Sequence, residues 1–408
     1  MKLAFVDNLS VYGGLSRFSL LLCKSLVETE PGLTIDYYSH INNLRHAPEL
    51  KEIPGIKIHV LQSTMLPGLP TRILRKLNRK FTRTEQDIEN KVISEIEEKI
   101  NGQYDVAYFP AAHMMKRPDL KIPMVGTLHD FNWKYFFGRQ IFSLEFVEMM
   151  DKEILNWMDN GVNVCSSHDV VDEAKKLYPG AKRYPNVVHI APVIYNADIP
   201  EARKQEILKD LKIDFPYIIF PGNFFPHKNH LNLLTAFSML KKRQGFGEYK
   251  LLLTGMNSNQ VPRGIAEKRG VQMLTKNSVP HENDVWGMGY QPNEVIDTLI
   301  SKARLLVSPS IYEAICTPAM DAWHFGTPTA ISDIPPFREH ERVWGIRSAF
   351  FDPLDPVDIA NTIENYLNQY DEAKLDGLIS KENVSKHNWG TVAGNYMQNF
   401  KKAISERK

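Results

Sequence analysis

Short apolar runs alternate along the chain with longer segments of helical periodicity. In the first half these runs lie at 3–6, 34–38, 56–60, 105–109, 123–128, 162–165 and 187–190. In the second half they lie at 216–220, 250–254, 305–307 and 329–331. Apolar runs of this length that end in a turn are typical of buried strands. Because helical segments separate them, the pattern predicts α/β domains with parallel sheets.

The helical segments have an apolar face. Apolar residues recur on one side at 18, 21, 22 and 26, at 88, 92, 96 and 100, and at 231, 234, 237 and 240. Such spacing predicts amphipathic helices that pack on a sheet. Further helices are predicted at 293–302, from Pro356 onward, and from about 389 to 404.

Length and composition bound the class of protein. At 408 residues the chain is too long for one ordinary core, so we expect two domains of about 200 residues each. A hydrophobic fraction of 43% and a charged fraction of 24% are those of a soluble globular protein, and the net charge of +1 gives no sign of nucleic-acid binding. Cys23, Cys165 and Cys316 have no paired or metal-type spacing, which fits a reducing compartment. Without a signal peptide or a run of transmembrane length, we expect a cytoplasmic protein.

One stretch has an unusual charge pattern. Between 66 and 83, six Lys and Arg residues alternate with apolar residues at helical spacing. This pattern is typical of a helix that lies on an anionic membrane, which would place the protein at the inner face of that membrane. A basic, solvated helix packed on its own domain explains the same pattern equally well.

The first strand leads into a glycine turn. Gly13 and Gly14 follow the run at 3–6 and precede a helix, which is the opening of a Rossmann-like unit. Such a glycine pair is either plain turn chemistry or part of a cradle for a phosphate or sugar. Because the G-x-G-x-x-G fingerprint is absent, a dinucleotide-dependent dehydrogenase is the weakest interpretation.

Two further strand ends carry candidate side chains. His129 follows the run at 123–128, and ligands of open α/β sheets bind at the carboxyl ends of strands. After the run at 216–220 come Gly222 and Asn223, and then Lys228 at the start of a helix. A lysine in that position is well placed to meet a diphosphate as a point charge.

The stretch from Ser308 to Pro328 carries the acidic candidates. We expect Thr317 to cap a helix that has Pro318 at its first position and ends at Gly326. Glu313 would then lie on the loop before this helix, and Asp321 one turn inside it. A phosphate can dock at the unpaired first amides of a helix, and the two carboxylates would flank it.

This stretch resembles the donor-site signature of retaining, GT-B-type glycosyltransferases of family four, also called glycosyltransferase group 1. In that family two acids separated by seven residues flank the nucleotide-sugar, and here they would be Glu313 and Asp321. The resemblance extends in order over nearly the whole chain, through Gly13-Gly14, His129 and Lys228. The sequence Gly-Asn-Phe-Phe-Pro-His-Lys-Asn-His, from 222 to 230, looks most like bacterial mannosyltransferases.

Three features depart from the family pattern. The second acid is usually Glu and is here Asp321, which is one methylene shorter. The residues after the first acid are usually rich in glycine and are here Ala314, Ile315 and Cys316, which limits how closely the backbone approaches a phosphate. An arginine that often precedes the lysine is replaced by Asn223.

The resemblance implies a GT-B fold, with two Rossmann-like α/β domains that face each other across a cleft. It also implies transfer of a sugar from a nucleotide diphosphate donor to a hydroxyl of a glycan or lipid-linked acceptor, with retention of anomeric configuration. The favoured sugar is mannose, with GDP-mannose as the donor. No cofactor and no metal are expected, since Lys228 and the amides of 314–317 would stabilise the diphosphate. Glu313 would hold the donor sugar, Asp321 the ribose, and His129 with Gly13-Gly14 would position sugar and acceptor.

The expected domains are 1–194 on the acceptor side, a linker at 195–212, a nucleotide-sugar domain at 213–388, and a helix at 389–408 that crosses back to the first domain. Two other functions remain open. A sugar-nucleotide epimerase of the same fold would bind the donor without an acceptor, and a non-catalytic partner would bind it without turnover.

Overall fold

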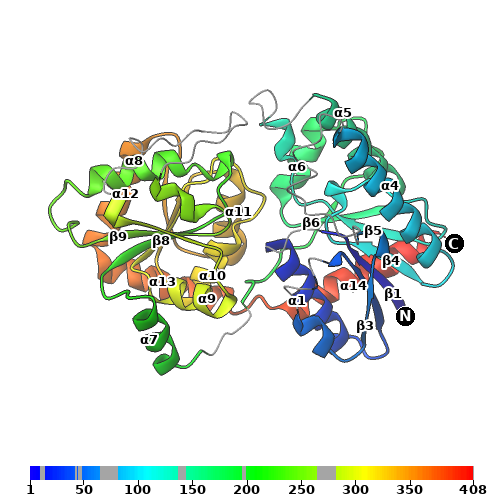
Figure 1. Ribbon diagram of the computed structural model, residues 1–408, viewed down its shortest axis with the longest axis horizontal. Helices are drawn as coiled ribbons and strands as arrows, with labels where there is room; N and C mark the ends of the chain where they lie inside the picture. Colours follow the sequence, from blue (N-terminus) through cyan, green and yellow to red (C-terminus); the bar gives the residue numbers. More distant parts are fainter. Residues whose placement is uncertain are drawn as a thin grey trace. The chain divides into compact units, whose positions relative to one another are not determined.

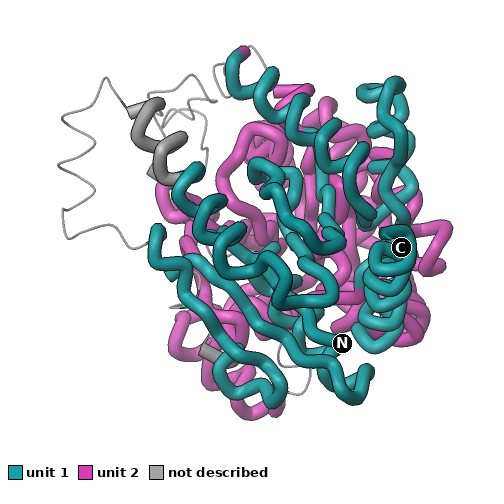
Figure 2. Tube along the Cα trace, turned by 90° about the vertical axis from the view of Figure 1, so that its right-hand side faces the viewer, with its two compact units in different colours: residues 1–131, 145–190, 389–408 teal, residues 132–144, 191–388 magenta. Residues whose placement is uncertain are grey.

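The computed structural model describes residues 1–9, 14–41, 44, 48–64, 81–136, 144–194, 199–263 and 282–407. These residues form two compact units, coloured teal and magenta in Figure 2. Unit 1 comprises residues 1–131, 145–190 and 389–408, and unit 2 comprises residues 132–144 and 191–388. Gly13 and nearly all of the basic stretch at 66–83 lie outside the described residues.

Unit 1 is built on a parallel sheet in the order β3-β2-β1-β4-β5-β6-β7. Its strands are β1 (Lys2–Asp7), β2 (Thr34–Ser39), β3 (Ile56–Val60), β4 (Val106–Phe109), β5 (Met124–Thr127), β6 (Val162–Cys165) and β7 (Asn186–Val187). The first three strands extend the sheet in one direction and the later ones in the other. The order therefore reverses between β1 and β4, where a Rossmann-like sheet binds its ligand.

Helices cover both faces of this sheet (Figure 1). They are α1 (Gly14–Thr29), α4 (Phe81–Ile100), α5 (Leu144–Asn160), α6 (His168–Leu177) and α14 (Trp389–Ser405). Helix α14 packs against α1 and against β4, β5 and β6, so the end of the chain completes the core of unit 1. The aromatic rings of Tyr108 and Tyr396 are 5.5 Å apart at this contact.

Unit 2 repeats the architecture with a parallel sheet in the order β10-β9-β8-β11-β12-β13. Its strands are β8 (Tyr217–Pro221), β9 (Lys250–Thr254), β10 (Val285–Gly289), β11 (Leu305–Ser308), β12 (Thr329–Ser332) and β13 (Ala349–Phe351). Here the strand order reverses between β8 and β11. Two loops that are far apart in sequence thus leave the sheet side by side at its carboxyl edge.

The helices of unit 2 form two groups (Figure 1). They are α7 (Glu201–Asp210), α8 (His230–Leu240), α9 (Asn293–Lys302), α10 (Thr317–Phe325), α11 (Pro335–Trp344), α12 (Pro356–Asn368) and α13 (Tyr370–Val384). Helix α8 packs with α12, whereas α10 packs with α9 and α13. Ile218 and Phe220 join the core beneath α8 and α12, and the intervening Ile219 is buried on the opposite face. Both faces of the sheet are therefore covered, as the continuous apolar strands predicted.

Most predicted elements are confirmed, and two details are wrong. The strand predicted at 187–190 is the two-residue β7. Thr317 is the first residue of α10 rather than its cap, and the cap position is Cys316. Ser167 caps α6 by accepting the amide of Val170 at 3.3 Å.

The range predicted as a linker contains a helix. Helix α7 packs on α9, and Arg203 forms ion pairs there with Glu294 at 3.0 Å and with Glu206 at 2.8 Å. These residues belong to unit 2. Among the described residues, none of the helices combines the length and apolar character needed to cross a bilayer.

Candidate functional site

The candidate site of unit 2 lies where β8 and β11 run side by side. Leu305 pairs with Ile218 and Leu306 with Ile219 in parallel register. The loop after β8 carries Asn223 and Lys228, and the loop after β11 carries Glu313. The strand order therefore brings together the side chains that the sequence analysis selected from two distant segments.

Lys228 and Glu313 form an ion pair. Their side chains are 21% and 9% exposed, respectively, so the pair is largely withdrawn from solvent. A backbone hydrogen bond of 2.8 Å from Ile311 N–H to the carbonyl of His227 joins the two loops just beside the pair. A positive and a negative group thus lie next to each other at the carboxyl edge of the sheet.

Asn229, which was not among the predicted site residues, holds this arrangement in place. Its backbone is left-handed, with φ of 57°, between the short helical turn at Pro226–Lys228 and α8. Its side-chain amide is buried and donates to the carbonyls of Pro309 at 2.9 Å and Pro353 at 2.6 Å. An asparagine between two helical segments is the signal that could have indicated it, because Asn adopts the left-handed region more readily than most residues.

The loop after β8 is held against the loop after β9. Gly222 N–H donates to the carbonyl of Thr254 at 2.9 Å, and the side-chain oxygen of Asn223 accepts the amide of Met256 at 2.7 Å. Gly255 has φ of 108°, and a Cβ atom there would lie 2.6 Å from the carbonyl oxygen of Gly222. The Asn223 side chain that replaces an arginine therefore braces the loop on β9.

The segment between Glu313 and α10 packs inward. Ala314 and Cys316 are buried, whereas Ile315 and Thr317 are half-buried. Burial, followed by the charge of Glu313, raises the pKa of the Cys316 thiol to about 12, so this thiol stays neutral. Its sulfur lies 3.5 Å from Ser308 Oγ. Helix α10 ends at Gly326 with φ of 77°, as predicted.

Asp321 lies on the buried side of α10. Its carboxylate is 1% exposed and accepts the backbone N–H of Val193, also in unit 2, at 3.0 Å. The second acid thus has a partner in the chain segment that enters unit 2. A role in binding a ribose stays a prediction.

His129 occupies the corresponding edge of unit 1. The ring is 8% exposed, and its Nε2 lies 2.7 Å from the carbonyl oxygen of Pro110. Burial, followed by the charge of neighbouring His113, lowers the pKa of His129 to about 3, so the ring is neutral. Gly14, the other described candidate of unit 1, is the exposed first residue of α1.

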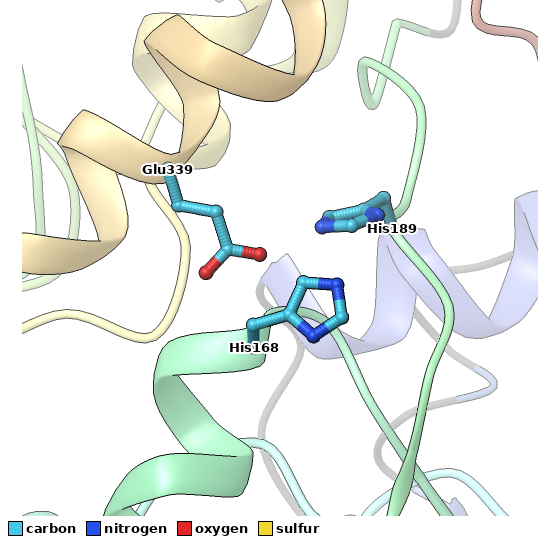
Figure 3. Close-up of side chains that lie close together, drawn as sticks. All are labelled: His168, His189 and Glu339. Carbon is cyan, nitrogen blue, oxygen red and sulfur yellow. The ribbon is translucent and has the colours of Figure 1, made fainter.

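Three further histidines lie at the carboxyl edge of this sheet. The ring of His113 is 5.3 Å from that of His129. His168, the first residue of α6, and His189, just after β7, have rings 5.6 Å apart, and both appear in Figure 3 with Glu339 of α11 in unit 2. Each of these histidines follows the end of a strand, β4, β6 or β7, and this position is the signal in the sequence that could have indicated them.

His230 gives unit 2 a predicted dependence on pH. Its ring is 1% exposed between Phe220 and Phe224, and no described residue provides a hydrogen-bond partner for either nitrogen. Burial, followed by the charges of Lys228 and His227, lowers the pKa of His230 from 6.5 to about 3. As the pH falls, this histidine is protonated in the unfolded chain before it is protonated in the folded one. Its effect on the free energy of unfolding is therefore absent above pH 6.5, and the folded state loses stability as the pH drops from 6.5 towards 3.

We expect the free energy of unfolding of unit 2 to fall by about 1.4 kcal/mol per pH unit below 6.5 from this residue. A His230→Leu variant should not show this fall with pH. At neutral pH its free energy of unfolding should equal or exceed that of the wild type. Urea denaturation at several pH values measures both slopes. Equal slopes in the two proteins would contradict the assignment.

Residues 203–377 match the family model described as glycosyl transferases group 1. The chain is 24% identical over 281 residues to mannosylfructose-phosphate synthase of Agrobacterium fabrum, a match that covers 65% of this chain and 60% of the relative. It is 29% identical over 139 residues to O-antigen chain mannosyltransferase B of Escherichia coli, covering 34% of this chain and 33% of the relative. The matches thus span less than two thirds of these curated relatives.

The fold is similar to that of Anabaena HepE, solved in complex with UDP-glucose. The TM-score is 0.69 at 13% identity, with 98% of this chain and all of that chain covered. Residues 203–377 of this chain are thus similar to the glycosyl transferases group 1 family, and the chain as a whole has a GT-B fold of two Rossmann-like α/β units.

Proposed function

We propose that this protein is a retaining, metal-independent glycosyltransferase that moves a sugar from a nucleotide diphosphate to an acceptor hydroxyl. The observation that carries the proposal is the Lys228–Glu313 ion pair at the point where the strand order of unit 2 reverses. Ligands of open α/β sheets bind at this point. The family of residues 203–377 and the UDP-glucose bound to the similar fold of HepE support a nucleotide-sugar as that ligand.

The two charges have complementary tasks in this proposal. Lys228 would turn from Glu313 to the diphosphate and stabilise the negative charge that develops on it as the sugar leaves. Glu313 would then accept hydrogen bonds from hydroxyls of the donor sugar. The first amides of α10, near Thr317, would face the same phosphates, since the N-terminal end of a helix favours anions.

The donor and the acceptor are also part of the proposal. We favour GDP-mannose as the donor for two reasons. The loop at 222–230 resembles those of mannosyltransferases, and the names of both curated relatives refer to mannose transfer or to a mannosyl product. The names of the same relatives support two acceptor classes. An O-antigen chain enzyme supports a glycan or lipid-linked acceptor, and a mannosylfructose-phosphate synthase supports a sugar phosphate.

A thermal-shift panel tests the donor. The purified protein is heated with GDP-mannose, UDP-glucose, UDP-N-acetylglucosamine, GDP, UDP and NAD. A ligand that binds only the folded state stabilises it by about 2.7 kcal/mol at a hundredfold excess over Kd. We expect a higher midpoint with the guanosine ligands, and a loss of that shift in Lys228→Ala. Lys302→Ala is the matched control, because Lys302 forms a surface ion pair with Glu201 in the same unit.

Donor turnover separates the remaining alternatives. Transfer predicts slow hydrolysis of the donor that speeds up when acceptor extract is added. An epimerase would convert the donor sugar without any acceptor, and a non-catalytic partner would bind the donor without consuming it. A shift with NAD alone would rule out the proposal.

A further inference from the structure

Unit 1 contains a cavity that the proposed reaction does not use. Its volume is about 310 Å³, and it lies beside the amino ends of β5 and β6, which begin at Met124 and Val162. His129 follows the carboxyl end of β5 instead. The cavity therefore lies at the edge of the sheet opposite to the one that carries the histidines described above.

Residues from three segments and Arg183 line this cavity. The segments are 117–124 before β5, 159–162 between α5 and β6, and 403–407, in which α14 ends. An apolar wall with a few polar groups is typical of a small-molecule site, and the volume lies at the lower end of the range of about 300 to 1,000 Å³ for such sites. A ligand of this cavity would therefore be compact. The apolar wall consists of the buried side chains of Leu120, Ile122, Met124, Val162 and Ala403.

Arg117 is held in a fixed position in the lining. Its Nη2 donates to the carbonyl oxygen of Asn160 at 2.7 Å, and its guanidinium lies over the ring of Trp157, 5.7 Å from the centroid. Among the described residues, none forms an ion pair with Arg117, and none accepts a hydrogen bond from its Nε or Nη1. This half-buried guanidinium thus keeps donors for a further acceptor.

The positive charge of Arg117 is only partly compensated. Burial lowers the pKa of the guanidinium below its usual value, and the negative charges of Asp119 and Glu153 raise it by less than burial lowers it. The carbonyl end of α5, at Asn160, favours a cation but supplies only about half an elementary charge. An anion in the cavity would supply the rest, because a charge withdrawn from water is costly unless it is paired.

The other charged groups leave the lining positive. Arg183 and Glu406 form an ion pair with each other. Asp159 accepts the backbone N–H of Lys182 at its Oδ1, at 2.8 Å. Arg407 is exposed and forms no ion pair with any described residue. Apart from the Arg183–Glu406 pair, the lining thus contains two guanidinium groups and one carboxylate.

We propose that this cavity binds a small, soluble phosphate monoester through Arg117 and Arg407. A phosphate monoester carries a charge of about −1.5 to −2 at pH 7 and three acceptor oxygens, so it satisfies two guanidinium groups at once. A carboxylate carries a single charge. The small volume favours a compact soluble ester over the headgroup of a lipid, which is the other source of the same chemistry. The inference does not depend on the proposed transferase activity.

The experiment measures ligand binding to the full chain by calorimetry. The probes are glycerol 3-phosphate, glycerate with the same carbon number, and glycerol. Co-sedimentation with phosphatidylcholine vesicles that contain phosphatidic acid tests the lipid source. The variants are Arg117→Gln, Arg407→Gln and Asp159→Asn. Arg347→Gln is the matched control, because this guanidinium of unit 2 is 59% exposed and lies 3.6 Å from Asp376.

We expect glycerol 3-phosphate to bind to the wild type, and glycerate and glycerol to bind at least about tenfold more weakly. Each of the two arginine variants should weaken binding by about tenfold, since a hydrogen bond to a charged group is lost. Asp159→Asn should strengthen binding about two- to threefold, because it removes a negative charge while the amide oxygen still accepts the Lys182 N–H. A general loss of stability would not produce changes of opposite sign. Arg347→Gln should change nothing.

Two results would overturn the inference. One is the absence of glycerol 3-phosphate binding, or binding that is equal in the wild type and both arginine variants. The other is vesicle binding that depends on Arg117 without binding of the soluble ester, since it would assign the cavity to a lipid headgroup. If Arg117→Gln does not fold, Arg407→Gln decides, because that side chain is exposed. The affinity for GDP-mannose should be equal in all variants, so a failure of the proposed function leaves this result unaffected.

Discussion

Replacing Glu313 by glutamine is expected to lower turnover of the nucleotide-sugar by about 10²- to 10³-fold, the range for loss of one group that stabilises charge or orients the reacting sugar. Glutamine keeps the shape of the side chain and removes its charge. Stability should change by only about 1 kcal/mol, because Lys228 is 21% exposed and water can take over part of its solvation. Donor hydrolysis and acceptor transfer, each followed by release of the nucleotide diphosphate, measure the effect.

The double variant Lys228→Met with Glu313→Gln separates a catalytic pair from a structural one. If the only role of each residue were to neutralise the charge of the other, removing both charges would restore the wild-type rate. If each contacts the donor, the double variant stays as inactive as the single ones. Wild-type turnover in Glu313→Gln would falsify the role proposed for this residue.

Replacing Gly255 by alanine is expected to destabilise unit 2 by about 3 to 5 kcal/mol, from backbone strain and overpacking together. The backbone φ of 108° is one that L-residues rarely adopt. The new Cβ would lie 2.6 Å from the oxygen and 2.7 Å from the carbon of the Gly222 carbonyl, and 2.9 Å from the amide of Asn223. Because backbone cannot turn aside as a flexible side chain does, the loop after β8 has to move.

This displacement reaches the candidate site through the loop itself. The affinity for the nucleotide-sugar should therefore fall together with stability. Urea denaturation and calorimetry at low temperature measure the two effects separately. Gly247→Ala is the matched control, since its Cβ meets nothing within 4 Å, and it should change neither quantity. A Gly255→Ala protein that binds the donor normally would show that the contact between the two loops does not shape the site.

The sequence by itself determined the elements of both units. The strand predicted at 56–60 and the helix at 293–302 have the bounds found for β3 and α9. The end of α10 at Gly326 was equally predictable. Hydrophobic periodicity, glycine at helix ends and proline at helix starts are local properties, so neighbouring residues suffice to determine them.

The error in the predicted start of α10 was small. Thr317 was predicted to cap this helix but is its first residue, because Thr suits both cap and first-turn positions and the sequence does not distinguish them. The candidate residues themselves came from a family resemblance, which selected Lys228 and Glu313 but gave no reason to choose Asn229.

Only the tertiary structure decided how these residues meet. Lys228 and Glu313 are 85 positions apart, Asn229 reaches Pro353 across 124, and Val193 reaches Asp321 across 128. Strand order places such segments together. The hydrophobic periodicity of a single strand does not determine the order in which parallel strands join a sheet. The sequence thus determined which elements form, whereas the packing of the strands determined which loops share an edge of the sheet.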